Sequence, residues 1–143
     1  VEVNEVVFME DRDRTVPRAV EALRKQGILV ALDDFGTGFA SLTHLLSFPV
    51  DIIKIDRSFV KNLGTDGPGE VVVDAIIEIA RKLKMRVVAE GIEDARQVEV
   101  LRRVGCNLGQ GYLFSRPVPL LDATQLLKSF AQPLPSRAQR RSA

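Results

Sequence analysis

Short apolar runs alternate along the chain with longer segments in which apolar residues recur at helical spacing. The runs are rich in β-branched residues, as strands buried on both faces are. The runs that predict strands cover residues 1–8, 28–34, 50–56, 85–91 and 107–114. The segments that predict helices cover residues 15–27, 41–48, 67–84, 94–105 and 119–131. Because strands that alternate with helices form βαβ units, the sequence predicts an α/β fold with a parallel sheet.

End signals support two of the predicted helices. Thr15 and Asp94 are candidate N-caps, and Gly27 and Gly105 follow the last apolar position of their helices. This pattern leaves two architectures open. The chain forms either an open doubly wound sheet or part of an eight-unit barrel, which takes roughly 250 residues when complete.

Composition narrows the class of protein. A chain of 143 residues has the length of one domain, and its net charge of +1 argues against a nucleic-acid polymer as partner. The single cysteine, Cys106, excludes an internal disulfide and favours a cytoplasmic location. No apolar stretch is long enough to span a membrane. The opening VEVNEVVFME lacks an initiator Met, so we expect a piece of a longer chain, and we expect residues 132–143 to form a basic, disordered tail.

Charged or amide residues stand on or directly after every predicted strand. They are Glu2, Glu5, Asp33, Asp34, Lys54, Asp56, Glu90, Glu93 and Gln110. The carboxyl ends of parallel strands meet at one face, and in (β/α)8 barrels that face carries the active site. These side chains are therefore expected to lie close together.

So many neighbouring carboxylates require cations to offset their repulsion. Carboxylate oxygens suit Mg²⁺ or Mn²⁺, whereas Zn²⁺ is disfavoured because the single Cys and the single His lie away from the strand ends. The pair Asp33–Asp34 can bridge two metal ions, an arrangement used for in-line attack on phosphate esters. Lys54 would then orient a water or meet phosphate charge.

Each of these features has an ordinary structural explanation when taken alone. Asp33–Asp34 can cap and solvate a turn, Lys54 can form a surface ion pair, and Glu90 can begin a turn. His44 and Cys106 fit structural roles, and the glycines of residues 36–38 lack the lysine of a phosphate-binding loop. The metal-site hypothesis depends on the joint occurrence of the strand-end groups.

Four ordered motifs carry a resemblance to a known family. They are LDDFGTGFASL (32–42), PVDIIKIDRSFV (49–60), VVAEGIE (87–93) and GCNLGQGYLFSRP (105–117). Together they resemble the EAL domain family of cyclic di-GMP phosphodiesterases, over residues 1–128. The resemblance implies a TIM-barrel-like (β/α)8 fold, of which about five βα units are present here. It also implies hydrolysis of cyclic di-GMP to linear pGpG with two Mg²⁺ or Mn²⁺ ions.

The resemblance also implies a role for each matching residue. Glu2, Asp33, Asp34 and Glu90 match metal ligands, with Asp33 bridging the two ions. Lys54 would position the attacking water, and Glu5 would hold the loop that follows the aspartates. Glu93 and Gln110 match further active-site positions, and a loop coupling substrate, metals and dimer interface comprises Phe35, Gly36, Thr37 and Gly38.

The chain departs from the family pattern in several places. Asn4 replaces a threonine and Asn107 replaces an aspartate, and the glutamate-alanine-leucine strand and an asparagine ligand are expected to precede residue 1. The triplet EAL at 21–23 lies in a predicted helix and is a coincidence. We therefore expect a partial EAL domain over residues 1–131 that is inactive alone and pairs as a homodimer, within a parent carrying fused sensory or GGDEF domains.

A second function stays open beside phosphodiesterase activity. Non-catalytic modules of this kind keep the barrel and bind cyclic di-GMP or a protein partner after losing metal ligands. A module freed from catalysis has no physical need for the full set of matched ligands and the lysine. Because Glu2, Asp33, Asp34, Lys54 and Glu90 are all retained, the enzyme is the favoured hypothesis.

Overall fold

The computed structural model describes residues 1–4, 6–7, 11, 15–36, 45–46, 49–65 and 67–130. It contains a parallel sheet whose strands lie in sequence order. The strands are β1 (Glu2–Asn4), β2 (Ala31–Phe35), β3 (Ile52–Ile55), β4 (Arg86–Ala89) and β5 (Leu108–Gly109). Each strand pairs in parallel with the next, which confirms the predicted α/β fold.

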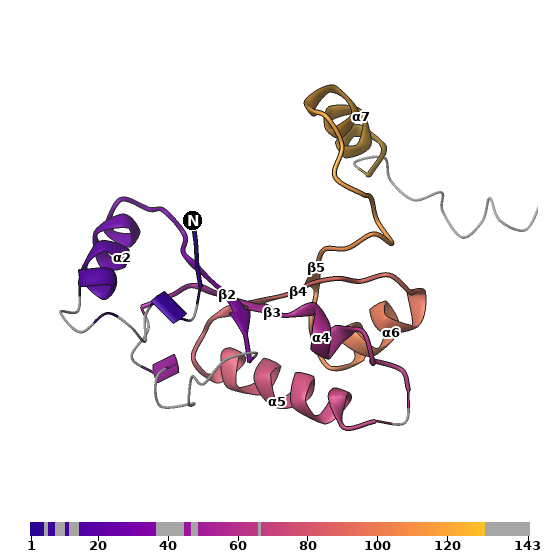
Figure 1. Cartoon of the computed structure of the whole chain (residues 1–143), viewed down its shortest axis with the longest axis horizontal. Helices are drawn as coiled ribbons and strands as arrows, with labels where there is room; N and C mark the ends of the chain where they lie inside the picture. Colours follow the sequence, from indigo (N-terminus) through magenta and orange to yellow (C-terminus); the bar gives the residue numbers. More distant parts are fainter. Residues whose placement is uncertain are drawn as a thin grey trace, which may run out of the picture.

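Helices connect and flank the strands. They are α2 (Thr15–Lys25), α4 (Arg57–Val60), α5 (Gly69–Lys82), α6 (Ala95–Arg103) and α7 (Leu120–Phe130). Figure 1 shows α5 and α6 along one side of the sheet, and α7 set apart at the end of an extended segment. Among the described residues, no helix is long and apolar enough to cross a membrane.

The core forms where α5 packs against the central strands. Val73 and Ile77 lie one helical turn apart on α5, and both are buried in the same cluster as the strand residues. Leu32 on β2 and Ile53 and Ile55 on β3 have no measurable exposure. Fully burying a side chain of this size contributes about 1.5–3 kcal/mol, so this packing fixes the strand that carries Lys54. The strand ends that carry the candidate site residues are therefore supported by a packed core.

Two predicted helix starts have different outcomes. Asp94 is the N-cap of α6, as predicted, and its carboxylate accepts the Arg96 backbone N–H at 2.7 Å. Thr15 is already helical, so its assignment as the N-cap of α2 was wrong. The carboxylate of Asp11 instead accepts the backbone N–H of Thr15 at 3.0 Å and that of Val16 at 2.7 Å.

The first and last predicted strands were too long. β1 ends at Asn4, and residues 6–7 are helical. β5 keeps only two residues because the chain turns sharply after it: a Cβ on Gly111 would lie 2.1 Å from the backbone oxygen of Ile92. The four-residue helix α4 was missed. The predicted helix 41–48 is described only at 45–46, which is helical, and the expected tail 132–143 lies outside the described residues.

α7 is helical as predicted, but it buries no residue. Its apolar side chains are at least 60% exposed at Leu120, Leu121, Leu127 and Phe130. The sheet is also unpaired beyond β1 and β5 among the described residues. These edges and this helix face are the parts of the fold that lack a covering layer in the described chain.

Candidate metal and phosphodiester site

A buried lysine gathers carboxylates from three strand ends. The Nζ atom of Lys54, on β3, lies 2.9 Å from Glu2 Oε1 on β1 and 2.8 Å from Asp33 Oδ1 on β2. It also lies 2.8 Å from Oε1 of Glu90, which directly follows β4. The lysine side chain is 8% exposed, whereas the carboxylates range from 14% to 58%. The predicted convergence is therefore present at these four residues, although Glu2 is the first residue of β1 and reaches Lys54 through its side chain rather than from a carboxyl end.

The parallel register explains why these groups meet. Asn4 pairs with Asp33 across β1 and β2, and Lys54 pairs with Val88 across β3 and β4. Parallel neighbours place their carboxyl ends at the same edge, so residues far apart in sequence come together there. Glu90 is held at this edge by its backbone N–H, which donates to Ile55 O at 3.1 Å.

Electrostatics keep Lys54 charged in this setting. Burial alone lowers the pKa of the ammonium, but hydrogen bonds to Asp33, Glu90 and Glu2 outweigh burial and raise the pKa above its usual range. Lys54 therefore stays protonated at neutral pH and serves as an internal counter-ion for the carboxylates. Among the described contacts, this one ammonium faces three carboxylates, those of Glu2, Asp33 and Glu90.

Three of these carboxylates form a candidate cation site. Asp33, Asp34 and Glu90 each offer an oxygen, and the three oxygens lie within 4.8 Å of one another. Oxygen-only donors of this kind suit Mg²⁺ or Mn²⁺ and disfavour Zn²⁺ sites built on thiolate or imidazole. Three carboxylates contact the single ammonium of Lys54, and this excess of negative charge also favours a bound cation. The residues therefore fit a hard divalent cation.

Asp34 has an unusual backbone. Its φ is +54°, in the left-handed region that few residues other than glycine adopt, and the β2–β3 register shifts between Leu32 and Phe35. The irregularity lets consecutive aspartates share one edge, because in a regular strand their side chains would point to opposite faces. Asn4 Nδ2 donates to Asp34 Oδ2 at 2.9 Å. No local pattern in the sequence predicts this contact.

An amide from the last strand completes the cluster. Gln110 follows β5, and its Nε2 donates to Glu90 Oε1 at 2.5 Å. Its backbone N–H donates to Ala89 O at 2.9 Å, which fixes the residue beside β4. Gln110 was among the predicted site residues, and the structure brings it to Glu90.

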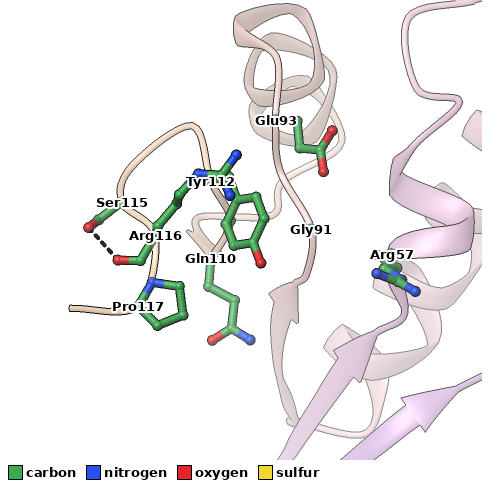
Figure 2. Close-up of a pocket in the computed structure, with 9 residues that line it drawn as sticks. Arg57, Gly91, Glu93, Gln110, Tyr112, Ser115, Arg116 and Pro117 are labelled. Carbon is green, nitrogen blue, oxygen red and sulfur yellow. Dashed lines mark hydrogen bonds between the residues drawn. The ribbon is translucent and has the colours of Figure 1, made fainter. Parts of the chain in front are cut away.

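A pocket of about 460 Å³ adjoins the cluster (Figure 2). Arg57 lies on the opposite wall from Tyr112 and Arg116, whose guanidinium carbon is 4.7 Å from the centroid of the Tyr112 ring. Glu93 and Gln110 also line the pocket, so it is continuous with the Glu90 side of the cluster. Sequence analysis missed the two arginines and the tyrosine, although Arg57 comes directly after the strand-end residue Asp56.

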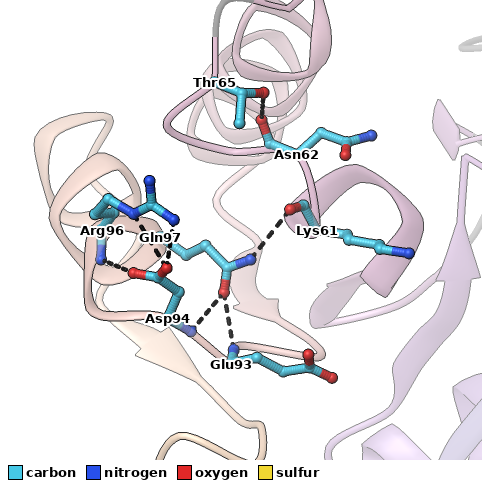
Figure 3. A network of polar contacts seen from close by, with 7 residues as sticks. All are labelled: Lys61, Asn62, Thr65, Glu93, Asp94, Arg96 and Gln97. Atoms are coloured by element: carbon cyan, nitrogen blue, oxygen red, sulfur yellow. Dashed lines mark hydrogen bonds and ion pairs between the residues drawn. The ribbon is translucent and has the colours of Figure 1, made fainter.

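Gln97 fastens the loop that carries Glu93 (Figure 3). Its Oε1 accepts the backbone N–H groups of Glu93 at 2.8 Å and Asp94 at 3.0 Å. Its Nε2 donates to Lys61 O at 3.3 Å, at the end of α4. Gln97 is only 6% exposed. One buried side chain therefore joins α6, the loop after β4 and the helix after β3.

Comparison with known proteins decides the family. The sequence model of the EAL domain matches residues 1–117. The chain belongs to the EAL domain family. It is 42% identical over 130 residues to the cyclic di-GMP phosphodiesterase NbdA of Pseudomonas aeruginosa, covering 91% of this chain and 16% of that protein.

Solved EAL structures agree with the fold. The EAL domain of Mycobacterium smegmatis DcpA matches with a TM-score of 0.85 and 39% identity, over 92% of this chain and 59% of that one. A manganese and cyclic di-GMP complex of Klebsiella pneumoniae BlrP1 matches with a TM-score of 0.75 and 36% identity, over 81% of this chain and 29% of that one. These neighbours confirm the TIM-barrel-like class of fold. The chain spans well under two thirds of each of these proteins.

The remaining predicted EAL site residues fall into two groups. Phe35 is 7% exposed and packs in the core, and Gly36 follows it with a φ of +95° and lies against the Phe59 ring. Glu5, Thr37 and Gly38 lie outside the described residues, as does His44.

Proposed function

We propose that this EAL domain contributes its part of the active site to two-metal hydrolysis of cyclic di-GMP to linear pGpG. The observation that carries the proposal is the convergence of the Glu2, Asp33 and Glu90 carboxylates on one buried lysine. The complex of the related BlrP1 with manganese and cyclic di-GMP supports the same assignment.

Each residue of the cluster has a proposed task. Glu2, Asp33, Asp34 and Glu90 would hold two Mg²⁺ or Mn²⁺ ions, with Asp33 between them. Such ions neutralise phosphate charge and lower the pKa of a water that they bind. Lys54 would hold and orient the attacking water. Its three ammonium donors are directed at Glu2, Asp33 and Glu90, so the water would replace one of these carboxylates when ions bind.

The adjoining pocket is proposed to receive a guanine base. The Tyr112 ring offers a stacking surface backed by Arg116. Arg57 on the facing wall carries the planar donors that pair with O6 and N7 of guanine, and the Glu93 carboxylate can accept from the base's N–H groups. Gln110 would connect this base pocket to the metal ligand Glu90.

Turnover is proposed to need more of the EAL barrel than this chain holds. The DcpA domain is longer than the matched region, which covers 59% of it. Because the two edge strands are unpaired and α7 buries no residue within the described part of the chain, we also propose that isolated copies associate as homodimers. In a longer parent, the missing strands and any sensory or GGDEF domain would cover these surfaces instead.

The test is hydrolysis of cyclic di-GMP by the intact protein that contains this chain, with Mg²⁺ or Mn²⁺ and chromatographic detection of pGpG. Asp33→Asn removes the bridging carboxylate, so we expect turnover to fall by at least a hundredfold, equivalent to about 2.7 kcal/mol of transition-state stabilisation. Equal rates in the two proteins would remove Asp33 from the mechanism. Tight nucleotide binding without turnover in either would instead favour a non-catalytic binding module.

A further inference from the structure

Asn4 makes two hydrogen bonds that together fix its side-chain amide. Its Nδ2 donates to Asp34 Oδ2 on the neighbouring strand at 2.9 Å. Its Oδ1 accepts the backbone N–H of Val6 at 2.9 Å. The second bond decides which end of the amide faces Asp34, since the backbone N–H needs an acceptor and the carboxylate needs a donor. Asn4 therefore presents an N–H group to this carboxylate in a defined orientation.

The backbone of Asp34 is left-handed, with a φ of +54°, a conformation that aspartate adopts more readily than most residues other than glycine. The backbone N–H of Asp34 has a long 3.2 Å contact with Asp33 Oδ1. The bond from Asn4 comes from another strand, so it ties the Asp34 carboxylate to the sheet rather than to its own turn.

We propose that Asn4 is a positioning residue that orients the Asp34 carboxylate for a divalent cation. The inference rests on the proposed role of Asp34 as a metal ligand. A carboxylate offers about four lone-pair sites, so one bond from an amide sets its plane and leaves it able to ligate. Partners of this kind around a metal site typically change metal affinity by about 10–100-fold when they are removed.

The chemistry of an amide suits this position. A carboxylate in place of Asn4 would add repulsion to a cluster where Asp33, Asp34 and Glu90 already meet within 4.8 Å. An ammonium would compete with the ion for Asp34. The neutral donor of Asn4 directs the ligand without either effect, which gives the departure from the family's threonine a specific function in this chain.

The experiment measures Mn²⁺ affinity of the intact protein that contains this chain by isothermal titration calorimetry. Asn4→Ser is the informative variant, because a serine hydroxyl still accepts the N–H two residues ahead but is too short to reach Asp34. We expect its Mn²⁺ dissociation constant to rise at least tenfold. Asn107→Ala is the matched control, since Asn107 is exposed and its side chain donates only to Gly105 O.

A double-mutant cycle separates positioning from general damage. If Asn4 acts through Asp34, adding Asn4→Ser to Asp34→Asn should weaken Mn²⁺ binding by less than about twofold, because coupled residues are not additive. Far-UV circular dichroism and urea midpoints without metal confirm that each variant is folded, and Asn4→Ala serves if the serine variant is not.

The possible results distinguish the positioning role of Asn4 from the assignment of Asp34 as a metal ligand. Weaker binding in Asn4→Ser that disappears in the Asp34→Asn background supports the inference. Unchanged binding in Asn4→Ser, alongside weaker binding in Asp34→Asn, overturns the role of Asn4 and leaves the metal site intact. If the unsubstituted protein binds no Mn²⁺, or Asp34→Asn binds equally well, the metal assignment fails and the inference fails with it.

Discussion

Replacing Lys54 by methionine removes the internal counter-ion of the site and keeps a side chain of similar length. Breaking a buried ion pair by removing one partner typically costs about 3–5 kcal/mol. The Glu2 carboxylate is 58% exposed and is screened by water, whereas Asp33 and Glu90 are 26% and 14% exposed. We therefore expect Lys54→Met to lower the free energy of unfolding by about 3 kcal/mol at neutral pH in chelator, near the lower end of that range.

The assay is urea denaturation followed by far-UV circular dichroism. Lys61→Met is the control, because Lys61 is exposed and its contact with Gln97 uses the backbone carbonyl, which the substitution keeps. Mn²⁺ should stabilise Lys54→Met more than the unsubstituted chain, since the ion replaces the lost positive charge among the carboxylates. Equal urea midpoints for Lys54→Met and the unsubstituted chain, with and without Mn²⁺, would refute the counter-ion role.

The pH dependence of this contribution has a definite sign. Burial lowers the pKa of Lys54, but hydrogen bonds to Asp33, Glu90 and Glu2 raise it above its ordinary value. A group whose pKa is raised on folding contributes stability fully below its unfolded pKa, about 10.4 for lysine, and loses it as pH rises through the folded value. On the alkaline side, the unsubstituted chain should therefore begin to lose more stability than Lys54→Met above roughly pH 10.4.

Two further substitutions test how the Glu93 loop is held. Gln97→Leu leaves two part-buried backbone N–H groups without their acceptor, so we expect the free energy of unfolding to fall by about 1–2 kcal/mol, measured by thermal unfolding. Gly91→Ala should cost about 2 kcal/mol or more, because φ is +67° and the new Cβ would lie 2.4 Å from Arg57 Cβ. Gly105→Ala is its control: φ is +90° but no atom lies within 4 Å, so only about 1 kcal/mol of backbone strain is expected. Equal losses in the two glycine variants would show that close packing at Gly91 is unimportant.

The strand ends were predictable because each carries its own local signal. Apolar runs that end in Asp33 or Glu90 indicate strands, and parallel pairing then brings their ends together without any knowledge of side-chain contacts. The same reasoning predicted that Lys54 lies near carboxylates, but it did not predict that the lysine is buried between three of them. A surface ion pair was the ordinary alternative, and the 8% exposure of the side chain decides against it.

Other features depend on contacts between distant segments and leave no periodic trace in the sequence. α4 is four residues long and begins where the Asp56 carboxylate accepts the Ser58 N–H at 2.9 Å, so helical periodicity could not reveal it. β5 is short because Gly111 packs directly on the Ile92 backbone. The bond from Asn4 to Asp34 requires both the strand register and the left-handed turn of Asp34, neither of which the sequence specifies locally.

The position of Lys54 bears on how the site would accept a metal ion. Two of the three candidate ligands, Asp33 and Glu90, already contact the ammonium at 2.8 Å. An entering cation must therefore share these carboxylates with Lys54, and Asp34 also accepts a hydrogen bond from the neutral amide of Asn4. Sharing limits how tightly one ion binds, because like charges around a common ligand repel. In the proposed mechanism it would also leave the ammonium near the phosphate and the attacking water. The arrangement would then combine moderate metal affinity with a fixed positive charge at the site.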